Sequence, residues 1–228
     1  MKSKYDQLMV FGCSNTLNGH IHDEPTSDLT AGEFTVQGSW SDQVARTLGL
    51  KLDNYGLAGS ANYWIYQRAI KALNTITDKT LVIVQWSYEC RAVARDDHIK
   101  PIHINLQHKH SRSYYDNFYI EDQEISKMLG WTLILSNLIP NLYFDFCDGS
   151  DHLREHSPEA FRSVEQLPGY LGLFGRPFHC HSIFDKSNRY ACSHLNTSGR
   201  AQLAKLYTLA LNSRGVGVNS CDTLVGPV

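Results

Sequence analysis

The stretch Thr80–Trp86 reads Thr-Leu-Val-Ile-Val-Gln-Trp and is the strongest strand pattern in the chain. It is continuous and rich in β-branched residues, as expected of a strand that helices cover on both faces. Such a strand belongs in the middle of a parallel sheet. We therefore predict that Thr80–Trp86 is the central strand of an α/β protein.

Strand and helix patterns alternate on both sides of this segment. The further predicted strands are Leu8–Phe11, Lys51–Tyr55 and Asn141–Phe146, and the predicted helices are Trp40–Leu48, Asn62–Ile76, Ile125–Leu138 and Thr197–Asn212. This order predicts a three-layer α/β sandwich with a parallel, flavodoxin-like sheet of about five strands. In such a sheet, ligands bind beyond the carboxyl ends of the strands.

The chain has no internal repeat and no Pro/Gly-rich linker, so we predict one domain over residues 1–212 and a loosely ordered tail over 213–228. Long loop insertions are expected at 97–122 and 149–183. The first insertion is rich in His and Tyr, which suits a lid or wall for a sugar or aryl ester. A solvated surface loop or a subunit contact explains that composition equally well.

Charge and cysteine content exclude several classes of partner. The chain has 21 Lys and Arg against 23 Asp and Glu, a net charge of -2, and no block of like charge, which argues against nucleic acid. No apolar run is long enough to span a membrane, and the N-terminus lacks a signal-peptide pattern. Both observations predict a cytoplasmic location. The six cysteines form no C-x-x-C pair, so we expect free thiols.

Four polar segments should meet at one edge of the predicted sheet. They are Gly12–Thr16, Asn54–Asn62 and Gln85–Arg91 after the first three strands, and Ser193–Gly199 at the start of the last helix. Together they supply Ser14, glycine-lined turns and His194. A serine needs an imidazole to take its proton and N–H donors to stabilise the oxyanion that forms, so this set indicates nucleophilic acyl transfer.

The same segments resemble sequence blocks of the SGNH (GDSL-type) hydrolases. Gly12-Cys13-Ser14-Asn15-Thr16 is similar to the first block, in a Gly-Cys-Ser-x-Thr variant found in phage and environmental members; Asn54 with Gly59 is similar to the second, and His194-Leu195-Asn196 with Gly199 to the fifth. The resemblance extends from Leu8 to about Leu211. It implies that Ser14 is the nucleophile and an oxyanion donor, that Gly59 is a second donor, and that His194 is the base, without any cofactor.

The third block departs from the family pattern. Its Gly-x-Asn-Asp falls on Gln85–Tyr88, so Ser87 stands where the family has the Asn that donates to the oxyanion. Asn62 or Gln85 can substitute for that donor. We therefore place Ser87 and Asn62 beside Ser14 and Gly59 in the predicted oxyanion hole.

The acid of the triad also departs from the pattern. Ala191 occupies the position three residues before His194 where the family has its acid. We place Asp185 in this role. Asp148 and Asp151, which follow the fourth strand, remain alternatives, as does a backbone carbonyl.

These features predict a serine esterase that cleaves small carboxylic esters, with acetyl groups on a carbohydrate as the favoured substrate. The missing third-block Asn and the missing acid support an alternative, a catalytically weak or inactive SGNH-fold binding or assembly module. The phage-type turn makes virion association part of that alternative. The partner in either case is a small molecule or a glycan ester, with no nucleic acid and no membrane.

Two His-containing patterns raise the question of a metal site. His152-Leu153-Arg154-Glu155-His156 has the H-x-x-E-H spacing of a zinc peptidase, but such a site needs an acidic ligand well downstream, and the last Glu of the chain is Glu165. His179-Cys180-His181 with Cys192 and His194 is a second group, and zinc there would compete for the predicted base. The sequence therefore predicts no metal site.

Overall fold

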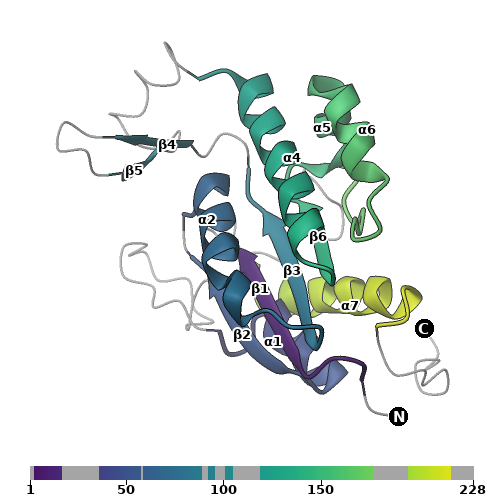
Figure 1. Cartoon of the computed structure of the whole chain (residues 1–228). Helices are drawn as coiled ribbons and strands as arrows, with labels where there is room; N and C mark the ends of the chain where they lie inside the picture. Colours follow the sequence, from purple (N-terminus) through teal and green to yellow (C-terminus); the bar gives the residue numbers. More distant parts are fainter. Residues whose placement is uncertain are drawn as a thin grey trace.

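The computed structural model describes residues 3–16, 36–57, 59–88, 119–176 and 195–216, and the backbone alone of 92–95 and 101–104. Its centre is a sheet of four parallel strands in the order β2-β1-β3-β6 (Figure 1). The strands are β1 (Gln7–Gly12), β2 (Lys51–Gly56), β3 (Thr80–Trp86) and β6 (Leu142–Phe146). The predicted α/β class and parallel sheet are confirmed.

The described sheet has four strands rather than about five, and beside β6 the described residues make a single bridge. Tyr170 pairs in parallel with Phe144. The Phe144 N–H donates to the Gly169 carbonyl at 2.9 Å, and the Leu171 N–H donates to the Phe144 carbonyl at 3.0 Å. A loop residue, Tyr170, thus pairs with β6 where a fifth strand would lie.

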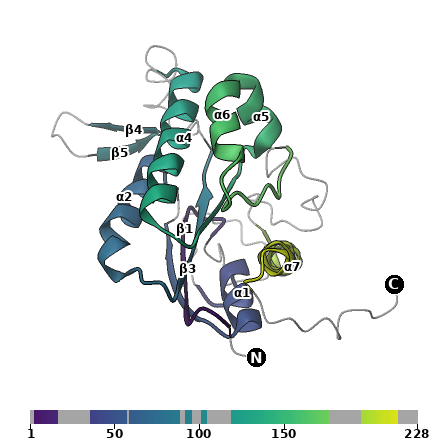
Figure 2. The same cartoon turned by 45° about the vertical axis from the view of Figure 1, so that its right-hand side comes forward.

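Helices cover both faces of the sheet, as Figures 1 and 2 show. On one face lie α1 (Trp40–Leu48) and α7 (Thr197–Ser213). On the other lie α2 (Asn62–Ala72), α4 (Glu121–Leu138), α5 (Gly149–His156) and α6 (Pro158–Glu165). The result is the predicted three-layer sandwich.

The alternation of side chains along β1 explains why its sequence is continuously apolar. Leu8 and Val10 pack into the core beneath α1 and α7, whereas Met9 and Phe11 pack into the core beneath α2 and α4. All four are buried. Because both faces of each central strand are covered, no position between the ends of β1 is left for a polar residue.

Element boundaries differ from the predictions mainly near the insertions. α2 ends at Ala72 and is followed by a short 3₁₀ turn, Leu73–Thr75, and α4 begins at Glu121 rather than at Ile125. β4 (Ala92–Arg95) and β5 (Pro101–Ile104) form an antiparallel hairpin. β4 precedes the first predicted insertion, 97–122, and β5 lies within it. The described part of the second insertion contains α5 and α6, so neither is wholly loop.

Among the described residues, no helix is both long enough and apolar enough to cross a membrane. Cys13 and Cys147 are buried, and neither belongs to a disulfide. The other four cysteines lie outside the described residues.

Candidate active site

The turn that carries Ser14 leaves the carboxyl end of β1 and is closed by bonds from neighbouring segments. Gly12 pairs with Gly56 of β2, so the segments after these strands leave the same edge of the sheet. The Gly12 carbonyl accepts from the Leu57 N–H at 3.1 Å, and the Thr16 N–H donates to the Cys13 carbonyl at 3.0 Å. Ser14 itself is 4% exposed. The predicted nucleophile is therefore held on a short, fixed turn.

Gly12 is required in this turn because there is no space for a side chain. A Cβ at this position would lie 1.8 Å from Thr16 Oγ1 and 3.2 Å from the Gln85 carbonyl oxygen. Such a separation from Thr16 is far inside van der Waals contact. The glycine at the start of the Gly-Cys-Ser-x-Thr pattern thus has a steric cause.

A chain of buried polar side chains ties the turn to the helices on one face. Thr16 Oγ1 donates to Gln85 Oε1 at 3.0 Å, and Gln85 Nε2 donates to the Tyr207 hydroxyl of α7 at 3.1 Å. Trp40 of α1 stacks on Tyr207 with ring centres 4.1 Å apart, and its Nε1 donates to the Asn15 carbonyl at 3.0 Å. Sequence reasoning had not connected Trp40 and Tyr207 with the turn.

Asn54, the first residue of the second block pattern, supports the turn from β2. Its Nδ2 donates to the Thr16 carbonyl at 3.0 Å and to Ser41 Oγ at 2.8 Å. Its Oδ1 accepts from the Gly56 N–H at 2.7 Å. The amide therefore fixes the relative position of the first two strand ends.

Arg68 places a positive charge beside the same turn. One of its terminal nitrogens donates to the Gly12 carbonyl at 3.0 Å and to Ser60 Oγ at 2.9 Å. Burial lowers the pKa of Arg68, and the neighbouring Cys13 acts in the opposite direction. An arginine remains charged in proteins, so its cation adds to the field at the carboxyl end of β1. The sequence did not indicate this role, because Arg68 belongs to no recognisable motif.

Gly59 follows β2 and has a backbone φ of +69°, a conformation that favours glycine. Within the described part of the chain, no heavy atom beyond its sequence neighbours lies within 4 Å of where its Cβ would be. Conformation, rather than crowding, therefore requires glycine here. Its donor role stays a prediction.

Asn62 and Ser87, the other predicted oxyanion residues, are bound to each other. Asn62 Oδ1 accepts from the Ser87 N–H at 2.7 Å, and Asn62 Nδ2 donates to the Ser87 carbonyl at 3.1 Å. The pair joins the start of α2 to the end of β3. This geometry favours a positioning role for Asn62. The hydrogen bonds of the Gln85 amide favour a positioning role for Gln85 in the same way.

His194 and Asp185 lie outside the described residues, so their proximity to Ser14 stays a prediction. The residue after His194, Leu195, is buried, and its carbonyl accepts from an Arg200 terminal nitrogen at 2.9 Å. Asn196 caps α7 by accepting from the Gly199 N–H at 3.0 Å. The chain that follows the predicted base is therefore anchored at the start of α7.

The two alternative acids differ in their surroundings. Asp148 is buried at the start of α5. Asp151 is 62% exposed and pairs with Arg154 at 3.4 Å. Burial makes Asp148 the better placed of the two for a role in a site.

Asp145 is a buried carboxyl that sequence reasoning missed. It lies in β6 directly opposite Gln85 of β3. Burial raises its pKa to about 7, although the N–H groups of Phe146 and Leu173 donate to it and act in the opposite direction. A single acidic residue within the apolar sequence Leu-Tyr-Phe-Asp-Phe was the available signal.

Comparison with known proteins gives structural similarity without sequence similarity. No family model and no curated protein matches the sequence. The lipase/acylhydrolase from Enterococcus faecalis is 13% identical over 92% of this chain and 96% of its own, with a TM-score of 0.56. An acetyl xylan esterase from Butyrivibrio proteoclasticus is 11% identical over 92% of this chain and 64% of its own, with a TM-score of 0.55. A lipolytic G-D-S-L family protein from Veillonella parvula is 11% identical over 91% of this chain and 96% of its own, with a TM-score of 0.48.

This chain has the fold of the SGNH hydrolases. Within this SGNH fold, Ser14, Gly59 and Ser87 follow β1, β2 and β3, in the order of the family's first three blocks. The predicted convergence of these strand ends is present. The donors and the base that would complete the site remain predictions.

Proposed function

We propose that this protein is a serine esterase that hydrolyses small carboxylic esters through an acyl-enzyme on Ser14. The observation that carries the proposal is the fixed turn. Ser14 is buried where the carboxyl ends of parallel strands meet, and the backbone around it is held by Arg68, Gln85 through Thr16, and Trp40. Groups fixed before the reaction stabilise a transition state without the cost of reorganisation.

In the proposed reaction, Ser14 Oγ attacks the ester carbonyl while His194 takes the hydroxyl proton. The N–H groups of Ser14 and Gly59 donate to the oxyanion of the tetrahedral intermediate. When this intermediate collapses, the alcohol leaves with the proton from His194. Water activated by His194 then hydrolyses the acyl-enzyme and restores the serine.

Two observations support a small acyl group on a carbohydrate as the substrate. Leu57, at the carboxyl end of β2, is 46% exposed and offers an apolar contact beside the site. One protein of similar fold is an acetyl xylan esterase. Acetylated xylan is therefore the first natural substrate to test.

The test compares Ser14→Ala with the wild-type protein and with Ser163→Ala, which removes an exposed serine on α6. We expect Ser14→Ala to lower p-nitrophenyl acetate turnover at least ~1,000-fold and to abolish fluorophosphonate labelling, because the nucleophile is lost. The control should keep both, and all three proteins should have similar melting temperatures. Equal turnover by Ser14→Ala would contradict the proposal.

A binding module is the second candidate, and the Asn62–Ser87 pair favours it. Ser87 replaces the family's oxyanion Asn, and its N–H is taken by Asn62. A site without this donor can hold an ester without cleaving it efficiently, since one missing donor costs roughly 100–1,000-fold in rate. Absence of fluorophosphonate labelling in the folded wild type, together with binding of acetylated xylo-oligosaccharides in calorimetry, would support this candidate.

A further inference from the structure

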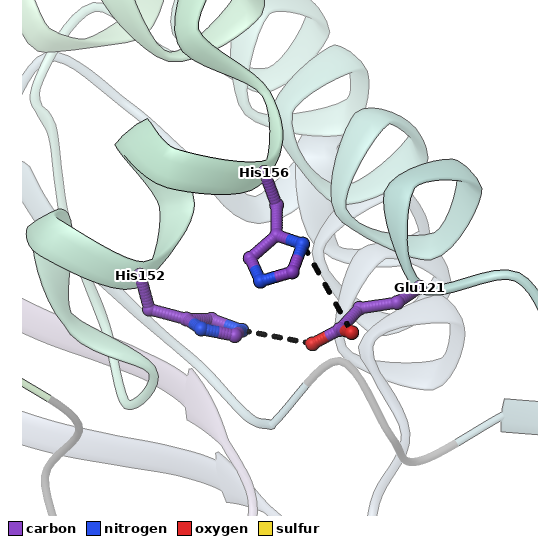
Figure 3. Close-up of side chains that lie close together, drawn as sticks. All are labelled: Glu121, His152 and His156. Carbon is purple, nitrogen blue, oxygen red and sulfur yellow. Dashed lines mark ion pairs between the residues drawn. The ribbon is translucent and has the colours of Figure 1, made fainter.

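Two helices that flank β6 bring two imidazoles and a carboxylate together (Figure 3). His152 and His156 lie one turn apart on α5, so they share a face of that helix. Glu121, the first residue of α4, extends between them. Its Oε1 lies 3.1 Å from His152 Nε2, and its Oε2 lies 4.0 Å from His156 Nδ1.

These separations are close to those of ligands around one metal ion. Zinc binds imidazole nitrogen and carboxylate oxygen at about 2.0–2.2 Å, so two ligands in tetrahedral geometry lie roughly 3.3 Å apart. The two measured separations lie on either side of this value, and the ligand atoms of all three residues lie within 4.8 Å of one another. Small side-chain rotations would bring the three onto one ion.

The donor set selects the class of ion. Imidazole nitrogens suit zinc and its transition-metal neighbours, whereas magnesium and calcium prefer oxygen ligands alone. The three side chains are between 24% and 36% exposed, so water can fill the remaining coordination position. Asp122 adds a second carboxylate 3.2 Å from His156 Nδ1.

We propose that Glu121, His152 and His156 bind a divalent transition-metal ion of the zinc class and that this ion links α4 to α5. The sequence alone predicts no metal at the H-x-x-E-H pattern, because no Glu lies well downstream of it. The fold supplies the acidic ligand from an earlier helix instead, since α4 packs against α5. The site shares no residue with the proposed esterase.

The experiment uses the full chain, freed of metal with a chelator, and titrates it with Co²⁺ and Zn²⁺. The ligand variants are Glu121→Gln, His152→Ala and His156→Ala. Glu155→Gln is the matched control, because it removes an exposed carboxylate from the same helix and lies between the two histidines in sequence. Circular dichroism checks that every variant is folded.

We expect Co²⁺ to give visible d–d bands in the wild type and in Glu155→Gln. Each ligand variant should weaken Zn²⁺ binding by at least ~10–100-fold, the loss usual when only an outer partner of a metal ligand is removed. Zn²⁺ should raise the melting temperature of the wild type and the control, and have little effect on the ligand variants. The chain has 11 histidines, so the comparison between variants separates this site from adventitious binding.

The proposal is overturned if Glu121→Gln and His152→Ala bind Co²⁺ and Zn²⁺ with the affinity and stoichiometry of the wild type. It is equally overturned if the wild type binds no more tightly than a His152→Ala/His156→Ala variant. In either case the cluster consists of ion pairs between the two histidines and the carboxylates of Glu121 and Asp122, without a metal ion.

Discussion

Replacing Gly12 with Ala tests the steric account of the nucleophile turn. The new Cβ would lie 1.8 Å from Thr16 Oγ1 and 2.8 Å from Thr16 Cβ, so Thr16 must move and lose its bond to Gln85. Overpacking a tight site costs about 1–3 kcal/mol, and leaving the buried Gln85 oxygen without a donor costs about 1–3 kcal/mol more. We expect the free energy of unfolding to fall by roughly 2–6 kcal/mol.

Urea unfolding of Gly12→Ala, Thr16→Gly and the double variant measures this coupling directly. Thr16→Gly removes both atoms that the new Cβ would strike, so Gly12→Ala should be much less costly in that background. We expect a coupling free energy of about 2 kcal/mol, within the range for residues in contact. An equal cost of Gly12→Ala in both backgrounds would refute the clash with Thr16 and, with it, our account of why the turn needs glycine.

Two further predictions concern the buried polar residues near the carboxyl ends of β3 and β6. Gln85→Leu leaves the hydroxyls of Thr16 and Tyr207 without their partner, so the free energy of unfolding should fall by roughly 2–4 kcal/mol in urea unfolding; an unchanged midpoint would contradict the proposed link. Asp145 has a pKa of about 7 in the folded protein and an ordinary value of 3.8, so between these values the folded state holds a proton that the unfolded state has lost. Stability should therefore fall as pH rises from about 4 to 7, by up to about 1.4 kcal/mol per pH unit, and Asp145→Asn should remove this contribution. Unfolding curves for both proteins at several pH values measure the difference, and identical slopes would show that the carboxyl does not titrate there.

The sequence alone predicts the bounds of those helices and strands whose local pattern agrees with their environment in the fold. The bounds of α1 and β3 are those predicted, because Trp40–Leu48 has a helical apolar spacing that ends at Gly49 and Thr80–Trp86 is buried on both faces. The hairpin of β4 and β5 was missed because each strand has only four residues. Short strands depend on their pairing partner more than on their own composition.

The candidate site was predictable only as far as strand ends and motif residues. Ser14 and Gly59 could be placed because each follows a strand that the pattern identifies. The partners of Gln85 could not be found in this way, since Thr16 and Tyr207 lie 69 and 122 residues away in the chain. For the same reason the sequence does not connect Glu121 with the H-x-x-E-H motif. The proximity of Glu121 to the motif depends on how α4 packs against α5.

The buried polar residues of β3 and β6 are better explained by positioning than by stability. Gln85 and Asp145 are paired in register, each one residue before the end of its strand, and both are fully or almost fully buried. An apolar core of the same shape is often as stable as a satisfied polar one, so burial of these groups brings little net stability. Their hydrogen bonds instead have direction, and through Thr16 and Tyr207 the Gln85 amide allows one arrangement of the turn relative to α7. A nucleophile on the turn and a base just before α7 must meet within hydrogen-bond distance, and such a link keeps the two segments in register.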